Sequence, residues 1–591
     1  MKSRSALLAL LFVCDFSAGA FVVELNSNGD PVRWHLNPLE PTVPPNPKGQ
    51  GVHTNVVNPA TRSVRFFLAA DAYSAANATT ELNAVRASFA QWQAIPGTFL
   101  KFEDAGLVAP GVDVNTSDDQ NVVFWAKNGT LVNGGMDNIS GALAVTFNSF
   151  FPDNNAQAEA DIVFNGVEYA WSADFNSADT TVQFIESTAA HEIGHFLGLK
   201  HSPVGGATML FRGAAGVNLQ AGLSSDEVAA AQWLYAQSST LATLGRLQGQ
   251  VTLSGSPVFG AAVLAEEAST GNLVAGTVTR ADGAYDLPAM PPGQYRVRVT
   301  PLDPSSASSF LIRGRDIASA YASAETGFLP TTNVIVTLTA GATGNSNFAV
   351  AVGSPAFRIT HIRQTGANAG SFRWSSLPAA IHPGQSNYFI GVASANLPTN
   401  DLTLAITGDG LTLGAPTFNN FSGLNSISVS ISVASNATPG LRSFIAQGGA
   451  EIAYANGFLE VQTMVPDFNF DGLDDRFQRQ YFPLFTAPEA APDADPDGDR
   501  FNNQAEYIAG TNPVNALSLL KIQGVSLDAK GSTLTWESVA GRRYQVWSRR
   551  DVANDPWRTV GPVVTAAGAS TQFTDASATG GFCFYRVQVL P

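Results

Sequence analysis

The stretch His191-Glu192-Ile193-Gly194-His195-Phe196-Leu197-Gly198-Leu199-Lys200-His201 decides the fold expected for the N-terminal part of the chain. On a helix, His191 and His195 are four residues apart and therefore lie on one face. Gly198 tolerates the left-handed backbone that ends a helix, so the chain can bend and bring His201 back as a third ligand. Three imidazoles with an open fourth position form the donor set of a catalytic zinc site. Glu192 is placed to take a proton from a metal-bound water.

The alternative interpretation of this stretch is an accidental match on a salt-bridged surface helix. The shorter pattern H-E-x-x-H occurs by chance in helices, but the extended pattern fixes five positions. Histidine is scarce, with 7 among 591 residues, and three of the seven fall within this stretch. The pattern therefore favours a metal site.

Composition and charge restrict the class of protein. The chain has 591 residues, 45% of them hydrophobic, and a net charge of −16, which predicts several folded domains. With a pI of about 4.8, it is not expected to bind nucleic acid or an anionic membrane surface.

Residues 1–20 are typical of a signal peptide and predict a secreted or cell-surface protein. Lys2 and Arg4 precede a short apolar core, and Ala18-Gly19-Ala20 forms a small-x-small cleavage site. The apolar core is too short to span a membrane, and no later run is long enough for a transmembrane segment. A buried N-terminal strand is the alternative. Because Cys14 would be removed, Cys583 would be the one remaining cysteine, a small buried hydrophobe without an intrachain disulfide.

Periodicity predicts alternating strands and helices before residue 240. Residues 21–60 form either a short leader or, through Val32–Leu36, a first strand. Leu82, Val85, Phe89 and Trp92 recur at helical spacing. Ser224 and Glu227 predict a capping box that opens a last helix through Tyr235. The predicted strands are 63–68, 99–102, 121–125, 141–147 and 160–165, and the other helices are 80–95 and 187–199.

Residues 30–240 resemble the catalytic domain of a metzincin metallopeptidase, most closely the matrixin branch. The resemblance rests on the His191–His201 motif, on Ser202, and on Met209 in Ala207-Thr208-Met209-Leu210. It also rests on the Ala160-Asp161-Ile162 strand and on Leu223-Ser224-x-Asp226. It implies an α+β domain, residues 21–240 with a short leader, in which a twisted mixed sheet packs on the active-site helix.

The resemblance also implies roles for single residues. His191, His195 and His201 would bind zinc, Glu192 would be the general base, and Met209 would pack beneath the metal. The 141–147 strand would form the upper rim of the substrate cleft, and Asp161 would lie in a calcium-binding region. Two departures matter: no cysteine lies between the signal peptide and the domain to block the zinc, and no histidine between residues 151 and 160 would bind a second, structural zinc.

The rest of the chain is predicted to form β-sandwich modules and a calcium-binding segment. Residues 247–350 resemble a carboxypeptidase-regulatory-like module, 352–463 an immunoglobulin-like sandwich, and 517–591 a fibronectin-III-like module. Residues 466–513 resemble thrombospondin type 3 or dockerin-like repeats, with Gln478 and Arg500 departing from the pattern. Oxygen ligands at alternate positions are typical of calcium loops; the candidate ligands are Asp467, Asn469, Asp471, Asp475, Asp495, Asp497, Asp499 and Glu506.

The leading hypothesis is a secreted, monomeric zinc metalloendopeptidase that hydrolyses peptide bonds of extracellular proteins. Zinc is the expected catalytic cofactor and calcium a structural one. The β modules would hold the enzyme on a polymer, a matrix or a cell surface. The alternatives are an adhesion or polymer-binding protein with a vestigial peptidase domain, and a zinc hydrolase that is not a peptidase. The intact Glu192 argues against the first, and Gly198, His201 and Met209 against the second.

Overall fold

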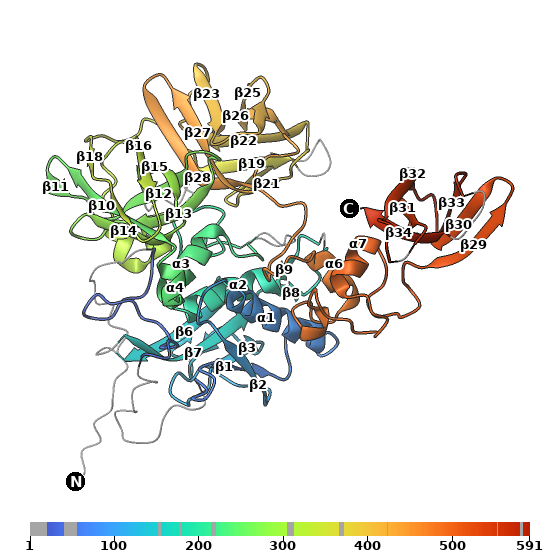
Figure 1. The fold of residues 1–591 in the computed structure, drawn as a ribbon. Helices are drawn as coiled ribbons and strands as arrows, with labels where there is room; N and C mark the ends of the chain where they lie inside the picture. The colour runs from blue at the N-terminus through green and yellow to red at the C-terminus, as the bar shows by residue number, and fades with distance from the viewer. Residues whose placement is uncertain are drawn as a thin grey trace, which may run out of the picture. The chain divides into compact units, whose positions relative to one another are not determined.

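The computed structural model divides the chain into two units, Met1–Met464 and Val465–Pro591 (Figure 1). The predicted signal peptide and most of the proline-rich stretch after residue 40 lie outside the described residues. The structure describes residues 21–40, 56–151, 155–177, 179–213, 220–303, 312–365, 372–421, 423–551, 553–578 and 583–590.

The first domain is built on a five-stranded mixed sheet with the order β2-β1-β3-β7-β6. Strand β6 lies at one edge and runs antiparallel to β7, whereas β1, β2, β3 and β7 pair in parallel. The five strands are β1 (Val64–Ala69), β2 (Phe102–Val108), β3 (Val122–Ala126), β6 (Ala144–Phe151) and β7 (Ala156–Asn165). Two small ribbons are β4 (Leu131–Val132) with β5 (Asp137–Asn138) and β8 (Ala170–Ser172) with β9 (Val182–Phe184).

Three helices complete this domain: α1 (Ala78–Gln93), α2 (Ile185–Phe196) and α3 (Ser225–Tyr235). Helices α1 and α2 lie side by side in the view of Figure 1, and Trp92 of α1 donates its indole N–H to the carbonyl of Ala190 in α2 at 2.9 Å. The predicted helical stripe of α1 is buried, as the periodicity required. The capping box of Ser224 and Glu227 is present, which confirms the predicted start of α3.

The N-terminal segment differs from the prediction. Within Val32–Leu36, Arg33 alone makes an isolated bridge, to Ala156, in place of a continuous strand. The segment is nevertheless part of the core, because Trp34 is fully buried and donates its indole N–H to the Phe196 carbonyl at 2.9 Å. Val22 also accepts a hydrogen bond from the backbone N–H of Lys200 at 2.7 Å. Residues 21–36 therefore support the end of α2.

The second module consists of two sheets whose core is continuous with that of α3. One sheet has β10 at its centre, and the other has the order β13-β12-β15-β16. Its elements are β10 (Gly245–Leu253), β11 (Ser256–Pro257), β12 (Ala261–Glu267), β13 (Leu273–Val278), β14 (Ala284–Met290), β15 (Gly293–Pro301), α5 (Gly314–Ile317), β16 (Thr331–Leu338), β17 (Thr343–Asn345) and β18 (Phe348–Val350), after the short linker helix α4 (Ser238–Leu241).

A third module also forms two sheets, around its own core. The alternating residues Ile427, Val429, Ile431 and Val433 are buried as predicted, but Ser426 and Ser428 are buried too, so burial is not confined to one face of this strand. Its strands are β19 (His361–Thr365), β20 (Phe372–Ser375), β21 (Ala379–Ile381), β22 (Tyr388–Ser394), β23 (Leu402–Ile406), β24 (Leu411–Leu413), β25 (Thr417–Phe421), β26 (Leu424–Val433), β27 (Gly440–Gly448) and β28 (Glu451–Val461).

The second unit contains a loop-rich segment followed by two three-stranded sheets. Cys583 is only half-buried, so the prediction of a buried cysteine is wrong. Among all the described residues, no helix is long and apolar enough to cross a membrane. The elements of this unit are α6 (Asp475–Tyr481), α7 (Asn503–Ala509), β29 (Ile522–Asp528), β30 (Gly531–Glu537), β31 (Arg543–Arg549), β32 (Arg558–Thr565), β33 (Ser570–Asp575) and β34 (Phe584–Leu590).

Candidate metal centre

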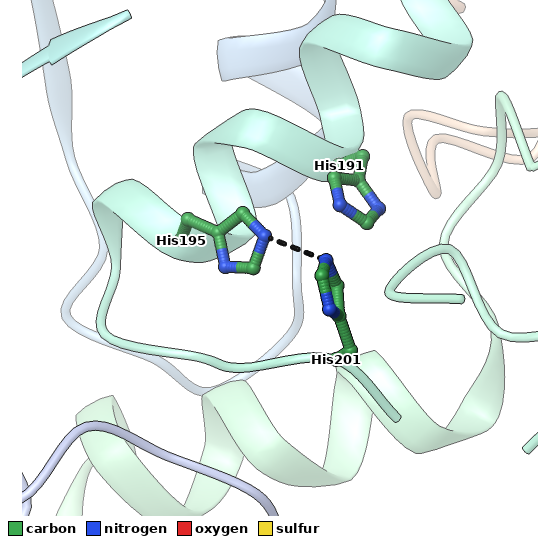
Figure 2. A group of neighbouring side chains, drawn as sticks. All are labelled: His191, His195 and His201. Atoms are coloured by element: carbon green, nitrogen blue, oxygen red, sulfur yellow. Dashed lines mark hydrogen bonds between the residues drawn. The ribbon is translucent and has the colours of Figure 1, made fainter. Parts of the chain in front are cut away.

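The structure brings the three predicted histidines together. His191 and His195 project from one face of α2, and the loop that follows returns His201 towards them (Figure 2). Gly198 makes this return possible: its φ is +97°, and a Cβ there would lie 2.2 Å from the carbonyl oxygen of Val32. One ligand atom of each ring lies within 4.8 Å of those of the other two rings.

The outer nitrogen of each ring is fixed by a backbone carbonyl. His191 Nδ1 donates to the carbonyl of Thr208 at 2.8 Å, and His195 Nδ1 donates to that of Leu199 at 2.7 Å. His201 Nδ1 donates to the carbonyl of Asp316. A carbonyl only accepts, so each Nδ1 carries the proton and each Nε2 keeps its lone pair. The Nε2 atoms of His195 and His201 face each other at 3.3 Å, an arrangement that fits a bound metal ion.

Burial keeps these rings neutral. It lowers the pKa of His191 to about 4 and that of His201 to about 3. It also lowers the pKa of His195 well below its ordinary value, and the charges of His191 and His201 would lower it further. Neutral imidazole is the form that binds a metal, so the three side chains are in a metal-binding form at neutral pH.

Glu192 lies beside the first histidine with its side chain almost fully buried. Burial raises its pKa to about 7, and a hydrogen bond from Thr146 acts in the opposite direction. Thr146 Oγ1 lies 2.6 Å from Glu192 Oε2 and 3.0 Å from the Glu192 carbonyl oxygen. The carboxylate is therefore held in one orientation by the edge strand β6.

The sequence analysis missed the role of Thr146. It placed the strand at 141–147 as a cleft rim, whereas β6 spans Ala144–Phe151. Asn148, two residues on, donates its amide N–H to the carbonyl of His195 at 3.0 Å. The available signal was two polar residues at alternate positions of one strand, which share a face.

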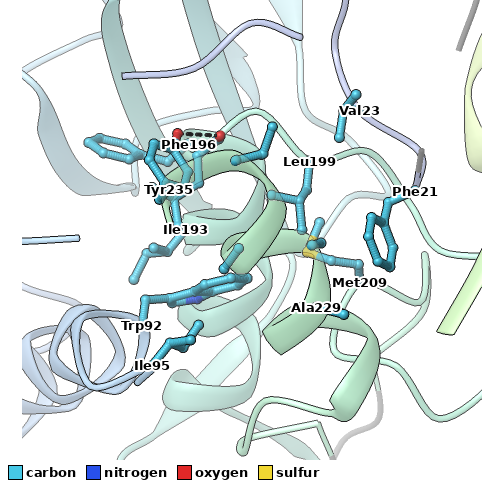
Figure 3. Close-up of a cluster of buried hydrophobic side chains, with 14 of the residues drawn as sticks. Phe21, Val23, Trp92, Ile95, Ile193, Phe196, Leu199, Met209, Ala229 and Tyr235 are labelled. Atoms are coloured by element: carbon cyan, nitrogen blue, oxygen red, sulfur yellow. Dashed lines mark hydrogen bonds between the residues drawn. The ribbon is translucent and has the colours of Figure 1, made fainter. Parts of the chain in front are cut away.

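Met209 packs against Gly194 of α2 within a buried apolar cluster (Figure 3); its predicted place beneath the metal stays a prediction. It is 1% exposed, and its backbone N–H donates to Oε1 of Glu227 at 2.9 Å. A Cβ on Gly194 would lie only 2.2 Å from the Met209 sulfur, so glycine at this helical position lets the methionine approach. The same turn carries the Thr208 carbonyl that holds His191, and the Met-turn thus supports the metal centre directly.

Asp161 is buried but engaged by the backbone. Its carboxylate accepts hydrogen bonds from the N–H groups of Asn115 and Val122, both at 2.8 Å. Burial raises its pKa to about 7. These contacts give Asp161 a structural role in joining β3 to β7.

The second unit contains the two predicted calcium loops, and they differ. In the second loop, Asp495, Asp497 and Asp499 place one carboxylate oxygen each within 4.8 Å of one another. Glu506 of α7 is 1% exposed, and neither of its carboxylate oxygens accepts a hydrogen bond. Burial raises the pKa of Glu506 to about 7, and the neighbouring aspartates raise it further. A buried carboxylate whose charge interacts with three nearby aspartates makes this loop a candidate cation site.

The first loop is arranged differently. Asp471 Oδ2 accepts hydrogen bonds from the side-chain amides of Asn469 at 2.9 Å and Gln478 at 2.7 Å. Asp467 accepts from the backbone N–H groups of Asp471 and Gly472. Amide donors thus occupy carboxylate oxygens that a cation would need.

The described features define a protein with a partly buried three-histidine centre and a buried glutamate on the same helix. Family models agree: residues 61–236 match the matrixin family, Peptidase M10, and residues 246–317 match the carboxypeptidase regulatory-like domain. The chain thus contains a matrixin domain, a metallopeptidase domain of the M10 type that implies zinc as catalytic cofactor, followed by a carboxypeptidase regulatory-like domain and further β-rich modules.

Other comparisons add little. No curated protein matches the chain. A structure of titin domains is 12% identical and covers 52% of this chain and 73% of that one, with a TM-score of 0.13. Fervidolysin from Fervidobacterium pennivorans, described as a keratinolytic enzyme related to subtilisin, is 12% identical and covers 37% of this chain and 31% of that one, with a TM-score of 0.12. These likenesses support no argument about fold or function.

Proposed function

We propose that the protein is a secreted zinc metalloendopeptidase that cleaves peptide bonds of extracellular proteins. The observation that carries the proposal is the set of three Nδ1–H···O=C hydrogen bonds, which leave the Nε2 lone pairs of His191, His195 and His201 free, with the three rings gathered in one cluster and Glu192 next to His191 on α2. A vestigial domain would have no need to keep ligands, tautomers and base together. The predicted signal peptide supports secretion.

The chain's own residues account for the proton transfers. Zinc, when bound, supplies a Lewis acid that polarises the scissile carbonyl and acidifies water. Glu192 takes a proton from the attacking water and passes it to the nitrogen of the leaving amine. Its raised pKa favours this exchange, since a base near neutral pKa both accepts and returns a proton. Thr146 restricts the orientation of the carboxylate through its hydrogen bond to Oε2.

The edge strand β6 supports a polypeptide substrate. It lies at the end of the sheet and contacts α2, so one of its edges is not paired within that sheet. An extended peptide can add to such an edge by main-chain hydrogen bonds. This binding mode would lay the substrate along the helix that carries His191 and Glu192.

The test is a casein or gelatin digest by the mature protein, with and without a zinc chelator, beside Glu192→Ala. We expect cleavage that the chelator and the variant both abolish, while Glu192→Ala retains zinc by elemental analysis. Unchanged cleavage by Glu192→Ala would refute the mechanism. Absence of zinc from the wild-type protein would refute the metal centre and move the adhesion hypothesis ahead.

We also propose that the second loop of the second unit binds calcium structurally, through Asp495, Asp497, Asp499 and Glu506. The buried Glu506, whose oxygens accept no hydrogen bond, supports this site. The first loop, with Asp467, Asn469, Asp471 and Asp475, would bind calcium only after the amides of Asn469 and Gln478 turn away from Asp471. The ligand of the β modules and the monomeric state stay predictions.

A further inference from the structure

The third histidine of the metal centre is held by a residue from outside the matrixin domain. The acceptors for His191 and His195 are the carbonyls of Thr208 and Leu199, which belong to that domain. The acceptor for His201 is the carbonyl of Asp316, in helix α5 of the second module. The metal centre therefore draws one of its three outer contacts from the neighbouring module.

The turn that presents the Asp316 carbonyl is tightly fixed. The backbone N–H of Arg313 donates to Asp316 Oδ2 at 3.0 Å, and its guanidinium contacts both carboxylate oxygens at 2.7 and 3.0 Å. Both side chains are less than 10% exposed. A Cβ on Gly314 would lie 1.9 Å from the Tyr321 carbonyl, so the helix packs closely on its neighbour. These contacts leave the carbonyl little freedom to move.

The second module is also anchored next to the loop between His201 and Met209, which we call the metal loop. Leu210, directly after the Met-turn, shares a buried cluster with Ile317 and Tyr321 of the second module. Asp226 bridges the same two parts: one of its oxygens accepts from Ser202 Oγ and the other from the backbone N–H of Gly276, both at 2.7 Å. The His201 contact is thus one of several that fix this interface.

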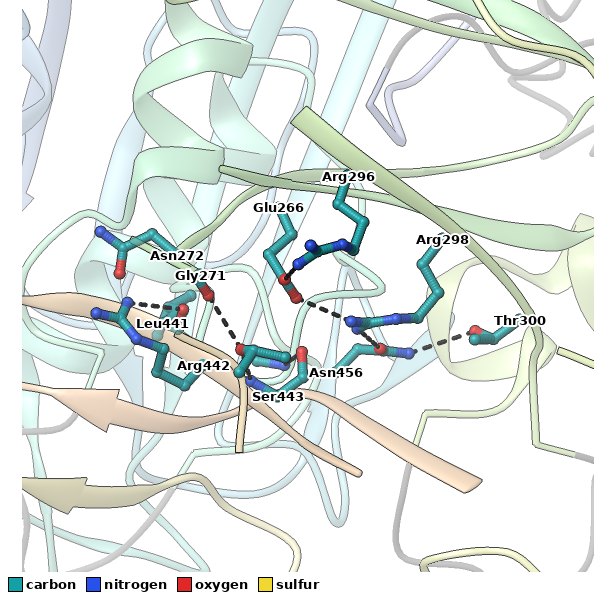
Figure 4. Close-up of polar contacts among 12 residues, drawn as sticks. Glu266, Gly271, Asn272, Arg296, Arg298, Thr300, Leu441, Arg442, Ser443 and Asn456 are labelled. Atoms are coloured by element: carbon teal, nitrogen blue, oxygen red, sulfur yellow. Dashed lines mark hydrogen bonds and ion pairs between the residues drawn. The ribbon is translucent and has the colours of Figure 1, made fainter. Parts of the chain in front are cut away.

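The third module contributes to the same support. Its Asn456 accepts a hydrogen bond through its carbonyl from the N–H of Gly205, in the loop between His201 and Met209. Through its side chain, Asn456 also contacts Arg298 and Thr300 of the second module (Figure 4). Arg298 is 3% exposed and pairs with the buried Glu266 at 2.8 Å. The metal loop therefore rests on both modules.

We propose that the second module is a positioning part of the metal centre, through the Asp316 carbonyl held by Arg313. The carbonyl fixes both the tautomer and the orientation of His201, and losing such an outer partner typically weakens metal binding about 10- to 100-fold. The inference rests on the proposed zinc site. In this view the module is required for a stable metal site and is more than a spacer or an attachment domain.

The test measures zinc release from the full mature chain to a chromogenic chelator. Asp316→Ala and Arg313→Gln both loosen the turn, and we expect each to release zinc roughly tenfold faster than wild type. The control is Asp286→Ala, which breaks an ion pair with the half-exposed Arg246 in the same module, Asp286 itself being 10% exposed, but touches no histidine. It should release zinc at the wild-type rate. Thermal unfolding of the metal-free proteins identifies any variant that fails to fold.

The outcomes separate the two proposals. Wild-type release rates in both Asp316→Ala and Arg313→Gln would overturn the positioning role while leaving the peptidase proposal in place. Equal acceleration by Asp286→Ala would overturn it as well, because the effect would then be general loosening of the module. A wild-type protein without zinc would refute the metal centre itself, and the inference with it.

Discussion

The close approach of Met209 to Gly194 predicts a strong coupling between these two residues. An added Cβ at Gly194 would lie 2.2 Å from the Met209 sulfur and 3.1 Å from its terminal methyl carbon. Ordinary contacts lie at about 3.5–4.0 Å, so Gly194→Ala must displace the methionine by roughly 1.5 Å. The Trp92 ring, 3.3 Å from the same Cβ, restricts the direction of that movement.

The net effect on stability follows from two opposing contributions. Overpacking a core typically costs about 1–3 kcal/mol. Alanine in a helix interior is favoured over glycine by about 1 kcal/mol. We therefore expect Gly194→Ala to lower the free energy of unfolding by about 0–2 kcal/mol. Activity should fall further, roughly ten- to a hundredfold in kcat/KM, because the displaced turn carries the carbonyl that orients His191 and a shift of about 1 Å at a catalytic site can cost that much.

A double-mutant cycle isolates the contact. Met209→Ala alone should cost about 2–5 kcal/mol through the cavity that it leaves. In a protein that already carries Gly194→Ala, Met209→Ala should cost less stability, because the new methyl group fills part of that cavity. The coupling free energy between the two substitutions should be about 0.5–3 kcal/mol. Denaturant unfolding and peptide hydrolysis are the assays, and Gly524→Ala, whose Cβ would meet no atom within 4 Å, is the control. Additive free energies, or full activity in Gly194→Ala, would refute the reasoning.

Three further predictions follow from single contacts. Thr146→Val removes the hydrogen bond that lowers the pKa of Glu192, so the acidic limb of the pH profile of kcat/KM should move to higher pH. Thr146→Ser keeps a hydroxyl group and should leave the limb at its wild-type position. An unmoved limb in Thr146→Val would contradict the assigned contact. Calcium should raise the melting temperature of the wild type but not that of Glu506→Gln. The control Glu489→Gln, at an exposed position, should respond to calcium as the wild type does. An equal shift in all three proteins would exclude Glu506 as a ligand. Gly198→Ala should lower the free energy of unfolding by about 2 kcal/mol or more, because the left-handed backbone is strained for alanine and the new Cβ clashes with Val32. The control Gly134→Ala, at φ +64° with open space around it, should lose only about 1 kcal/mol through strain. Equal losses in the two variants would contradict the clash.

The local parts of the metal centre could be predicted from sequence because they depend on short spacing. His191 and His195 share a helix face by periodicity alone, and Gly198 marks the bend that returns His201. The capping box at Ser224 and Glu227 is similarly local, and the structure confirms it. The burial of the stripe of α1 required only a helical period, whereas the start of α1, at Ala78 and not at residue 80, has no side-chain cap to mark it.

Contacts between distant segments could not be predicted in this way. Thr146 and Glu192 are 46 residues apart, and His201 and Asp316 are 115 apart. Backbone carbonyls accept most of the histidine hydrogen bonds, and a carbonyl carries no residue-type signal. Val32–Leu36 looked like a strand by alternation, but the structure gives it one isolated bridge, from Arg33 to Ala156 at the start of β7, and the loop after α2 pairs with residues 22–24 instead.

The adjacent pair Asp226 and Glu227 shows how a helix start is used to assemble the metal site. Glu227 closes the capping box and also accepts from the N–H of Met209, so the start of α3 fixes the Met-turn. Asp226 accepts hydrogen bonds from Ser202, the residue after His201, and from Gly276, and so joins the metal loop to the second module. Burial raises the pKa of both carboxyl groups, and this cost is offset by hydrogen bonds to backbone and hydroxyl donors. Two neighbouring side chains thus connect the metal loop to the helix below it and to the module beside it, which is why the metal centre and the second module are best understood as one structural unit.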